Sequence, residues 1–350
     1  AKESGILDGC FQFLFRMTRS VNDILSLLLR LAIVPAMLLA GICAHAQSDA
    51  QFSQYYQIKN YYNPAAIGTS DLLNIRGGAR LQWVGIDNAP KSFAATAEMP
   101  LKLFKKRIGV GVLMQQESLG LYKNLTAGVQ AGYKIKLFKG EMTAGVQIGF
   151  INQSFKGSEV VLPDDDNYHQ GTDEAIPTND LNGNAFDIGV GVYYTRGIWW
   201  GGLSMTHATQ PVISLKSDTG DNSLEHNYEF QVGRTLYFMA GCNIQIKNTL
   251  FEVMPSVLVK SDFTFTTGEA TARVRYNKFL TAGIGYRYND AVTISLGGEI
   301  KGFYLGYAYD YATSAIAKAS SGSHEIFAGY SLKLDFSEKN KNKHKSIRIL

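Results

Sequence analysis

Proline, cysteine and long apolar runs are all scarce in this sequence. Its 350 residues include only 8 prolines and 3 cysteines. Two of the cysteines, Cys10 and Cys43, lie within the first 46 residues, so the rest of the chain has only Cys242, which we expect to pack as a small apolar side chain. Beyond residue 46 no run approaches the roughly 18 apolar residues that a membrane-spanning helix needs. These shortages exclude a disulfide scaffold and a helical membrane domain for residues 47–350.

The signatures of catalytic and metal sites are missing as well. His324-Glu325 does not begin a His-Glu-x-x-His zinc motif, because Ala328 occupies the position of the second histidine. The 6 histidines are scattered without metal-ligand spacing, and no Gly-x-Ser-x-Gly nucleophile elbow occurs. We therefore expect a protein that is not an enzyme and that has no cofactor; a membrane-embedded enzyme is the least supported alternative.

An acidic stretch is the strongest candidate for a cation site. Residues 156–182 include Asp164, Asp165, Asp166 and Asp173. Carboxylate oxygens are calcium ligands, but this spacing matches no EF-hand loop. We interpret the stretch as a solvated acidic loop, and calcium binding stays open as the alternative.

The sequence is rich in glycine, with 35 residues, and in tyrosine and phenylalanine, with 19 of each. Within 279–288, Leu280, Ile284 and Tyr286 alternate with Gly283 and Arg287. Side chains alternate across a strand, so this pattern predicts a strand with one apolar and one polar or small face. The same pattern predicts strands near residues 71–84, 91–103, 106–117, 122–138, 140–155, 183–196, 198–207, 228–246, 249–261, 267–277, 279–288, 291–301, 302–312 and 323–336.

The connections between these runs are of two kinds. Short turns, such as residue 139 and residue 197, follow every second run, whereas longer loops follow the others, the largest at 156–182 and 208–227. Aromatic residues gather near the run ends, as in the belts at membrane–water boundaries. Both features are typical of outer-membrane barrels. We predict an all-β fold, a single antiparallel transmembrane β-barrel of about 14 strands in the outer membrane, with both termini periplasmic at the short-turn side.

The start of the chain differs from this repeating body. Arg16, Arg19 and Arg30 precede or enter an apolar run that ends in the small-x-small site at 44–46. This pattern predicts a cleavable signal peptide over residues 1–46, with a helical anchor as the alternative.

The predicted barrel spans residues 71–336 and is followed by a basic tail at 337–350. The tail contains four lysines, one arginine and a single acidic residue, Glu338, so its net charge is +4. The whole chain also has a net charge of +4. Since the basic charge lies in the tail and not in the body, we expect no nucleic-acid partner.

Charged residues recur on the polar faces of the predicted strands. They are Arg76, Arg80, Arg287, Glu299, Asp310 and Glu325. Buried charges need partners of opposite sign, so the mixture predicts ion pairs that brace the barrel lumen. A role in catalysis or permeation is the alternative.

Residues 47–70 have no clear period and are too aromatic for a free linker. The candidate functional residues in this segment are Phe52, Gln54, Tyr55, Tyr56, Tyr61, Tyr62, Asn63 and Pro64. Asn63-Pro64 predicts a turn. We expect the segment, on the periplasmic side before the first strand, to fold against the lumen or the rim, where it plugs the barrel or docks a partner. Plain local packing stays open.

Motifs at both ends of the body resemble one known family. Residues 49–56 and 61–68 are similar to the opening motif of the PorP/SprF outer-membrane proteins of Bacteroidetes, and residues 80–83 with 90–92 are similar to the next block. The glycine-rich stretch 109–112 and the ending at 309–326 agree with the same family. Ala50 departs from the family, which often has proline there. The resemblance spans roughly residues 49–336.

The resemblance implies an outer-membrane component of type IX protein secretion and gliding motility. Family members are thought to work with a periplasmic ring of a lipoprotein and associated subunits, and some with a particular secreted adhesin. The family has no catalytic residues to carry over. Its implied partners are therefore outer-membrane lipids, ring subunits and an adhesin, and the alternative function is an outer-membrane porin or transporter for small solutes.

Overall fold

The computed structural model describes residues 49–103, 106–160, 177, 179–217 and 228–334. The predicted signal peptide, the basic tail and most of the acidic loop lie outside these residues. The described part is built almost entirely of antiparallel strands. Their bounds are β1 (Leu72–Leu81), β2 (Lys91–Leu103), β3 (Lys106–Leu119), β4 (Tyr122–Leu137), β5 (Gly140–Phe155), β6 (Leu181–Arg196), β7 (Trp199–Thr206), β8 (Val212–Ser217), β9 (Tyr228–Gln231), β10 (Thr235–Cys242), β11 (Ile244–Gln245), β12 (Phe251–Ser261), β13 (Thr266–Tyr276), β14 (Leu280–Arg287), β15 (Ala291–Ile300), β16 (Phe303–Ala312) and β17 (Ser323–Lys333).

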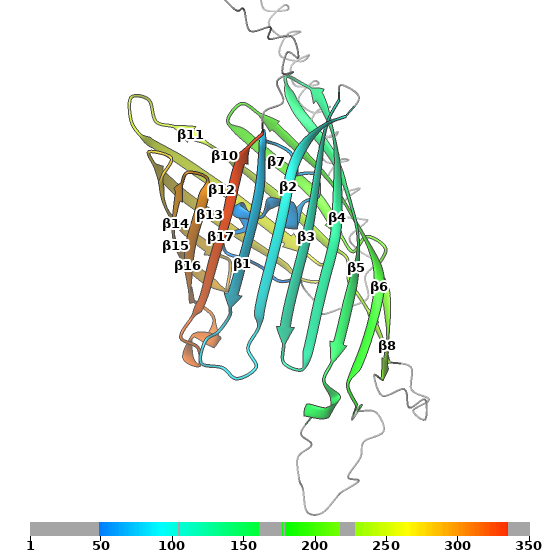
Figure 1. The fold of residues 1–350 in the computed structure, drawn as a ribbon. Coiled ribbons are helices and arrows are strands. Elements are labelled where there is room, and N and C mark those ends of the chain that lie inside the picture. Colours follow the sequence, from blue (N-terminus) through cyan, green and yellow to red (C-terminus); the bar gives the residue numbers. More distant parts are fainter. Residues whose placement is uncertain (1–48, 104–105, 161–176, 178, 218–227, 335–350) are drawn as a thin grey trace, which may run out of the picture. The chain divides into compact units, whose positions relative to one another are not determined.

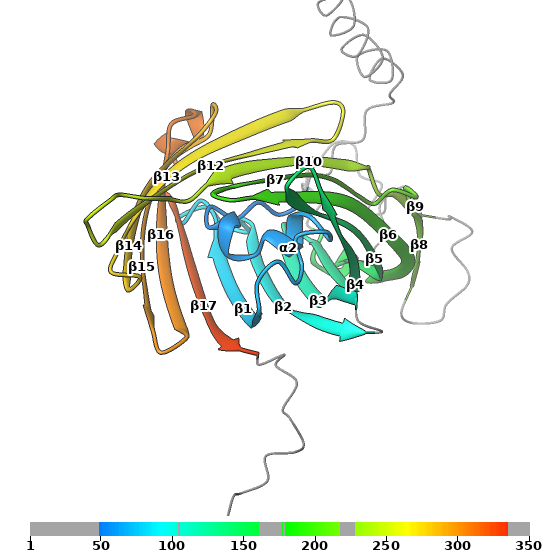
Figure 2. The same ribbon diagram turned by 90° about the horizontal axis from the view of Figure 1, so that it is seen from above.

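The strands close into a barrel, as Figure 1 shows from the side and Figure 2 from above. Each strand of the wall pairs with its neighbour in sequence, except that β7 pairs with β10. The last strand, β17, returns to β1 along its whole length, from Leu72 opposite Lys333 to Leu81 opposite His324. The prediction of a single barrel of about 14 strands is thereby confirmed, because the wall has 14 strands.

The extra strands lie outside this simple order. The single strand predicted at 228–246 is in fact three, β9, β10 and β11. Strand β9 pairs with β8, which the sequence did not predict, and β8 pairs with the start of β6 in the wall. Strand β11 continues β10 along β12.

The alternation of side chains places apolar residues outside. Ile284, Ile294 and Leu296 are more than half exposed, whereas Arg287 on the opposite face of β14 is buried. In a barrel whose outer face meets lipid, this arrangement removes apolar surface from water only when a membrane surrounds it. Among the described residues, no helix is long and apolar enough to cross a membrane.

The connections define two rims. At the short-turn rim, β4 and β5 are joined by Phe138-Lys139, both with positive φ (48° and 62°), as a tight primed hairpin turn requires. At the long-loop rim lie residues 82–90, 156–160 and 313–322. The predicted sorting is incomplete, because residues 120–121 and 288–290 at the long-loop rim are as short as the opposite turns.

Candidate functional site in the barrel lumen

Residues 49–68, here called the luminal segment, lie inside the ring of strands (Figure 2). The segment forms a short 3-10 helix, η1 (Tyr55–Gln57), and one helical turn, α2 (Lys59–Tyr62). All eight residues that the sequence singled out here are buried: Phe52, Gln54, Tyr55, Tyr56, Tyr61, Tyr62, Asn63 and Pro64. The segment therefore supplies most of the core of the barrel.

The luminal segment runs through the lumen from one rim to the other. Near the long-loop rim, Asp49 accepts a hydrogen bond from Tyr237 OH (2.8 Å) and contacts His207 Nε2 (2.9 Å). Near the short-turn rim, Gly68 N–H donates to Glu98 (2.9 Å), and Lys134 Nζ donates to the Gly68 carbonyl (3.0 Å). The sequence predicted that the segment folds against the lumen or the periplasmic rim. The segment lies in the lumen, where the wall offers partners along its full height.

A buried ionic cluster surrounds Ser53. Its hydroxyl donates to Asp310 Oδ2 (2.6 Å) and accepts from Arg80 Nη1 and Arg287 Nη2 (2.8 Å each). The two backbone N–H groups of Ser53 and Gln54 donate to the two oxygens of Glu325 (2.8 and 2.7 Å). The luminal segment therefore binds the cluster with both the side chain of Ser53 and the backbone N–H groups of Ser53 and Gln54.

The wall residues of this cluster also pair with one another. Arg80 lies 2.6 Å from Asp310 and 3.3 Å from Glu325, while Arg287 lies 2.9 Å from Glu269. All five side chains are at most 4% exposed. Such charges are tolerated away from water only because each has partners of opposite sign and hydrogen bonds.

Two of the six predicted braces, Arg76 and Glu299, do not join this cluster. Arg76 donates to Ser331 Oγ (2.8 Å) and lies against the Tyr304 ring, with 5.6 Å to its centroid. Glu299 interacts with Arg76 electrostatically, but among the described residues it makes no ion pair. Both side chains are half-buried near the short-turn rim, where water reduces the need for a paired partner.

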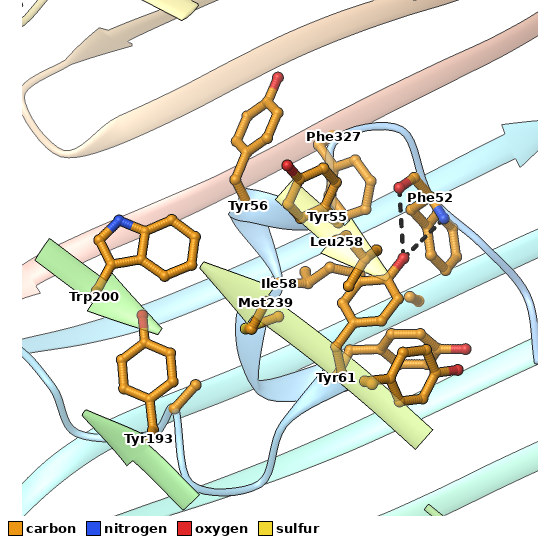
Figure 3. Close-up of a cluster of buried hydrophobic side chains, with 14 of the residues drawn as sticks. Phe52, Tyr55, Tyr56, Ile58, Tyr61, Tyr193, Trp200, Met239, Leu258 and Phe327 are labelled. Carbon is orange, nitrogen blue, oxygen red and sulfur yellow. Dashed lines mark hydrogen bonds between the residues drawn. The ribbon is translucent and has the colours of Figure 1, made fainter. Parts of the chain in front are cut away.

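Aromatic side chains fill the middle of the lumen, as Figure 3 shows. Phe52 packs edge-on against Tyr61 and against Phe327 of β17, with ring centroids 5.7 and 5.6 Å apart. Tyr62 packs in the same way against Tyr237 of β10 at 5.3 Å. The Tyr62 hydroxyl accepts a hydrogen bond from the Phe52 N–H (2.8 Å), so its polar end is satisfied although the side chain is fully buried.

Inward-facing glycines let the second half of the segment approach the wall. The Asn63 side chain lies against Gly191 of β6 and Gly202 of β7, where an added Cβ would stand 2.3 and 2.5 Å from it. Its amide donates to the carbonyl of Val192 (3.0 Å), and its oxygen accepts from the N–H of Ala65 (2.8 Å). Two further pairs of the same kind are Gly145 against Ala65 and Gly109 against Ile67.

Asp49 and His207 form a second charged contact, just beyond the end of β7. Burial by itself lowers the pKa of His207, but the carboxylates of Asp49 and Asp187 outweigh it and raise the pKa to about 10. Burial likewise opposes ionisation of Asp49, yet His207 and Lys260 hold the pKa of Asp49 well below its usual range. The pair is therefore charged at neutral pH.

A family model matches most of the chain. The model describes the type IX secretion system membrane protein PorP/SprF and matches residues 44–330. This chain belongs to the PorP/SprF family. The match includes the whole luminal segment and all strands of the wall except the end of β17.

Solved structures similar to this PorP/SprF chain are outer-membrane proteins. The toluene transporter TbuX of Ralstonia pickettii has 14% identity and a TM-score of 0.45, covering 79% of this chain and 93% of its own. The NalP autotransporter translocator domain of Neisseria meningitidis has 13% identity and a TM-score of 0.38, covering 75% and 87%. Identities this low transfer no substrate. No curated protein matches the chain.

Sequence reasoning missed several residues of the PorP/SprF lumen. Ser53, Asp49 and Glu269 make central contacts, but Ser, Asp and Glu are common residues and none of the three stands in a chemical motif. Gly191 and Gly202 had a usable signal, since glycine inside a strand indicates close approach of another backbone or a ligand. The sequence showed that these glycines lie within strands, but it did not show which part of the chain packs against them.

The luminal contacts hold the segment by charge, ring packing and shape. The carboxylates of Asp310 and Glu325 are engaged by arginines and by the segment. Among the described residues, no group of three or more His, Cys, Asp or Glu side chains is placed to hold a metal ion.

Proposed function

We propose that this PorP/SprF protein is a non-enzymatic structural and interaction subunit of type IX secretion, whose own lumen does not conduct solutes. The observation that carries the proposal is the position of Ser53. Its hydroxyl and N–H are held by Asp310, Glu325 and two arginines that come from four different strands. A segment joined to the wall in this way occupies the path that a permeating solute needs.

The energetics support a permanent occupant of the lumen. Displacing the segment leaves Glu325 without two backbone donors and exposes the paired aromatic rings. Each unsatisfied buried partner costs about 1–3 kcal/mol, and more when it is charged. Spontaneous opening at a useful rate is therefore disfavoured without a partner that supplies compensating contacts.

With the lumen occupied, partners bind at the rims. We place the subunits of the periplasmic ring at the short-turn rim and a secreted adhesin at the long-loop rim, because outer-membrane barrels have their short turns in the periplasm. The described long-loop rim includes the β8–β9 hairpin, which extends the sheet beyond β6 and offers backbone edges.

The test measures both the ion conductance of the barrel and the proteins that co-purify with it. Wild-type protein and a variant lacking residues 49–62 are inserted into planar bilayers, and both are purified from detergent-solubilised outer membranes with their bound proteins. We expect no steady conductance from the wild type, steady conductance from the deletion, and recovery of ring subunits with the wild type. A wild-type barrel that conducts steadily and recovers no partner would establish the porin alternative.

A further inference from the structure

An apolar groove of about 650 Å³ hollows the outer wall across β10, β12, β13 and β14. Small side chains form its floor and larger ones its sides. The floor residues are Ala240, Cys242, Pro255, Ala270 and Ala272, and the sides include Trp199, Ile284 and Tyr286.

Strand register explains the depth of this groove. Pro255 stands opposite Ala272, which stands opposite Ile284, and Ala270 stands opposite Tyr286. Residues opposite each other in adjacent strands share a face, so small side chains in β12 and β13 lie beside large ones in β14. Pro255 also lacks an N–H, so it donates no backbone hydrogen bond to a neighbouring strand.

The groove ends beside cationic side chains at the short-turn rim. Trp199 stands opposite Arg196 in the β6–β7 register. Arg196 in turn lines a polar pocket of about 550 Å³ between the β4–β5 and β6–β7 turns, together with Lys136 and Lys139. The Tyr194 hydroxyl donates to the Phe138 carbonyl (3.0 Å) and so joins the two turns.

The pocket has an excess of positive charge. The acidic residue that lines the pocket, Glu141, forms an ion pair with Lys134 (3.3 Å), which balances its negative charge. Within the described part of the chain, Arg196, Lys136 and Lys139 have no acidic partner within ion-pair distance. An amphipathic ligand with an anionic head and an apolar tail matches a cationic pocket next to an apolar groove, and the pair Arg196 and Trp199 stands where the two meet.

We propose that the pocket and the groove together bind one glycerophospholipid with a net anionic headgroup. Arg196 and Lys139 contact the phosphate, Trp199 lies at the glycerol level, and one acyl chain extends over Pro255 and Ala272. Arginine is suited to phosphate because its planar guanidinium donates two parallel hydrogen bonds. The groove is on the outer face of the wall and the pocket is at its rim, so the binding of the acyl chain does not depend on whether the lumen conducts.

The test compares lipid retention by native mass spectrometry after incubation with phosphatidylglycerol or phosphatidylcholine. The variants are Arg196→Gln/Lys139→Gln, which removes the charge, and Ala272→Trp, which fills the groove. Matched controls are Arg107→Gln at the same rim and Ala144→Trp on the exposed outer face of β5. Heat-modifiable migration in gels checks that each variant is a folded barrel.

We expect the wild type and both controls to retain one phosphatidylglycerol in preference to phosphatidylcholine. The charge variant and the groove variant should each retain about tenfold less, a loss of about 1.4 kcal/mol of binding free energy. Phosphatidylglycerol with brominated acyl chains should quench tryptophan fluorescence in the wild type and much less in Trp199→Phe.

Three results would overturn the proposal. The first is equal retention by all variants, and the second is retention of phosphatidylcholine as strong as that of phosphatidylglycerol. The third is loss of a co-purified membrane protein from Ala272→Trp with lipid retention unchanged, which would assign the groove to a protein partner. None of these results bears on conductance, so they are separate from a failure of the proposed function.

Discussion

The two halves of the luminal segment are held to the same wall by different physics. Around Ser53, charges and hydrogen bonds hold the chain, with Arg80, Arg287, Asp310 and Glu325 as partners. From Asn63 to Gly68, shape holds it, because backbone and small side chains rest on inward glycines. A charged contact is lost all at once when one partner is removed, whereas a steric contact changes with each added methyl group. The difference predicts distinct responses to mutation and pH.

Removing one charge from the ionic cluster should have the largest effect. Arg80→Met leaves Glu325 without its ion-pair partner and Asp310 with Arg287 alone, so we expect a loss of about 3–5 kcal/mol in the free energy of unfolding. Urea unfolding in detergent micelles, followed by tryptophan fluorescence, measures it. Under the proposed function, the same variant should conduct in planar bilayers. Unchanged unfolding would show that the cluster does not hold the segment.

Adding one methyl group on the glycine side should have a smaller effect. In Gly191→Ala the new Cβ would stand 2.3 Å from Asn63 Oδ1, so Asn63 must shift. We expect a loss of about 1–3 kcal/mol, which Asn63→Ala in the same chain should partly relieve. Gly268→Ala is the matched control, because its nearest atom is 4.0 Å away. Equal losses in the two glycine variants would contradict steric contact at Asn63.

The contact between Asp49 and His207 should make the long-loop end sensitive to pH. The pKa of His207 is raised to about 10 from 6.5, so its stabilisation is complete below pH 6.5 and disappears as the pH rises through 10. The lowered pKa of Asp49 acts in the opposite direction, and its stabilisation disappears only in strong acid. Melting temperature should therefore fall between pH 6.5 and 10 in the wild type, and less in His207→Gln. Parallel curves for the two proteins would refute this contact.

The smallest effect is expected at Glu299, which stands on an inward face as Glu325 does. Glu299→Gln removes a half-buried charge without an ion pair, so the change should stay within about 0.5 kcal/mol. Glu325→Gln, in contrast, removes the charge paired with Arg80 and turns an NH2 donor toward one of two backbone N–H groups, so it should resemble Arg80→Met. Urea midpoints of the two variants make the comparison. Similar losses of unfolding free energy in Glu299→Gln and Glu325→Gln would mean that an inward position, and not the set of partners, decides the cost of the substitution.

Most strands of the barrel wall could be predicted from local sequence patterns. Period-two alternation predicted the strands, and short turns such as Phe138-Lys139 predicted the hairpins. The β8–β9 hairpin escaped because its strands are 6 and 4 residues long, too short for a clear period. Six inward charges were identified, but their sequence positions contained no information on which of them meet.

The sequence by itself determined that this chain makes strands with an apolar outer face, because side-chain alternation is a property of the local backbone. Only the tertiary structure decided what fills the inside. Arg80 and Glu325 are neighbours because β17 closes on β1, and Ser53 reaches both because the segment before β1 turns inward. The position of the luminal segment along the barrel axis follows from charge pairing around Ser53 and from contact with inward-facing glycines between Asn63 and Gly68. Such contacts join residues more than 200 positions apart, and no local pattern encodes them.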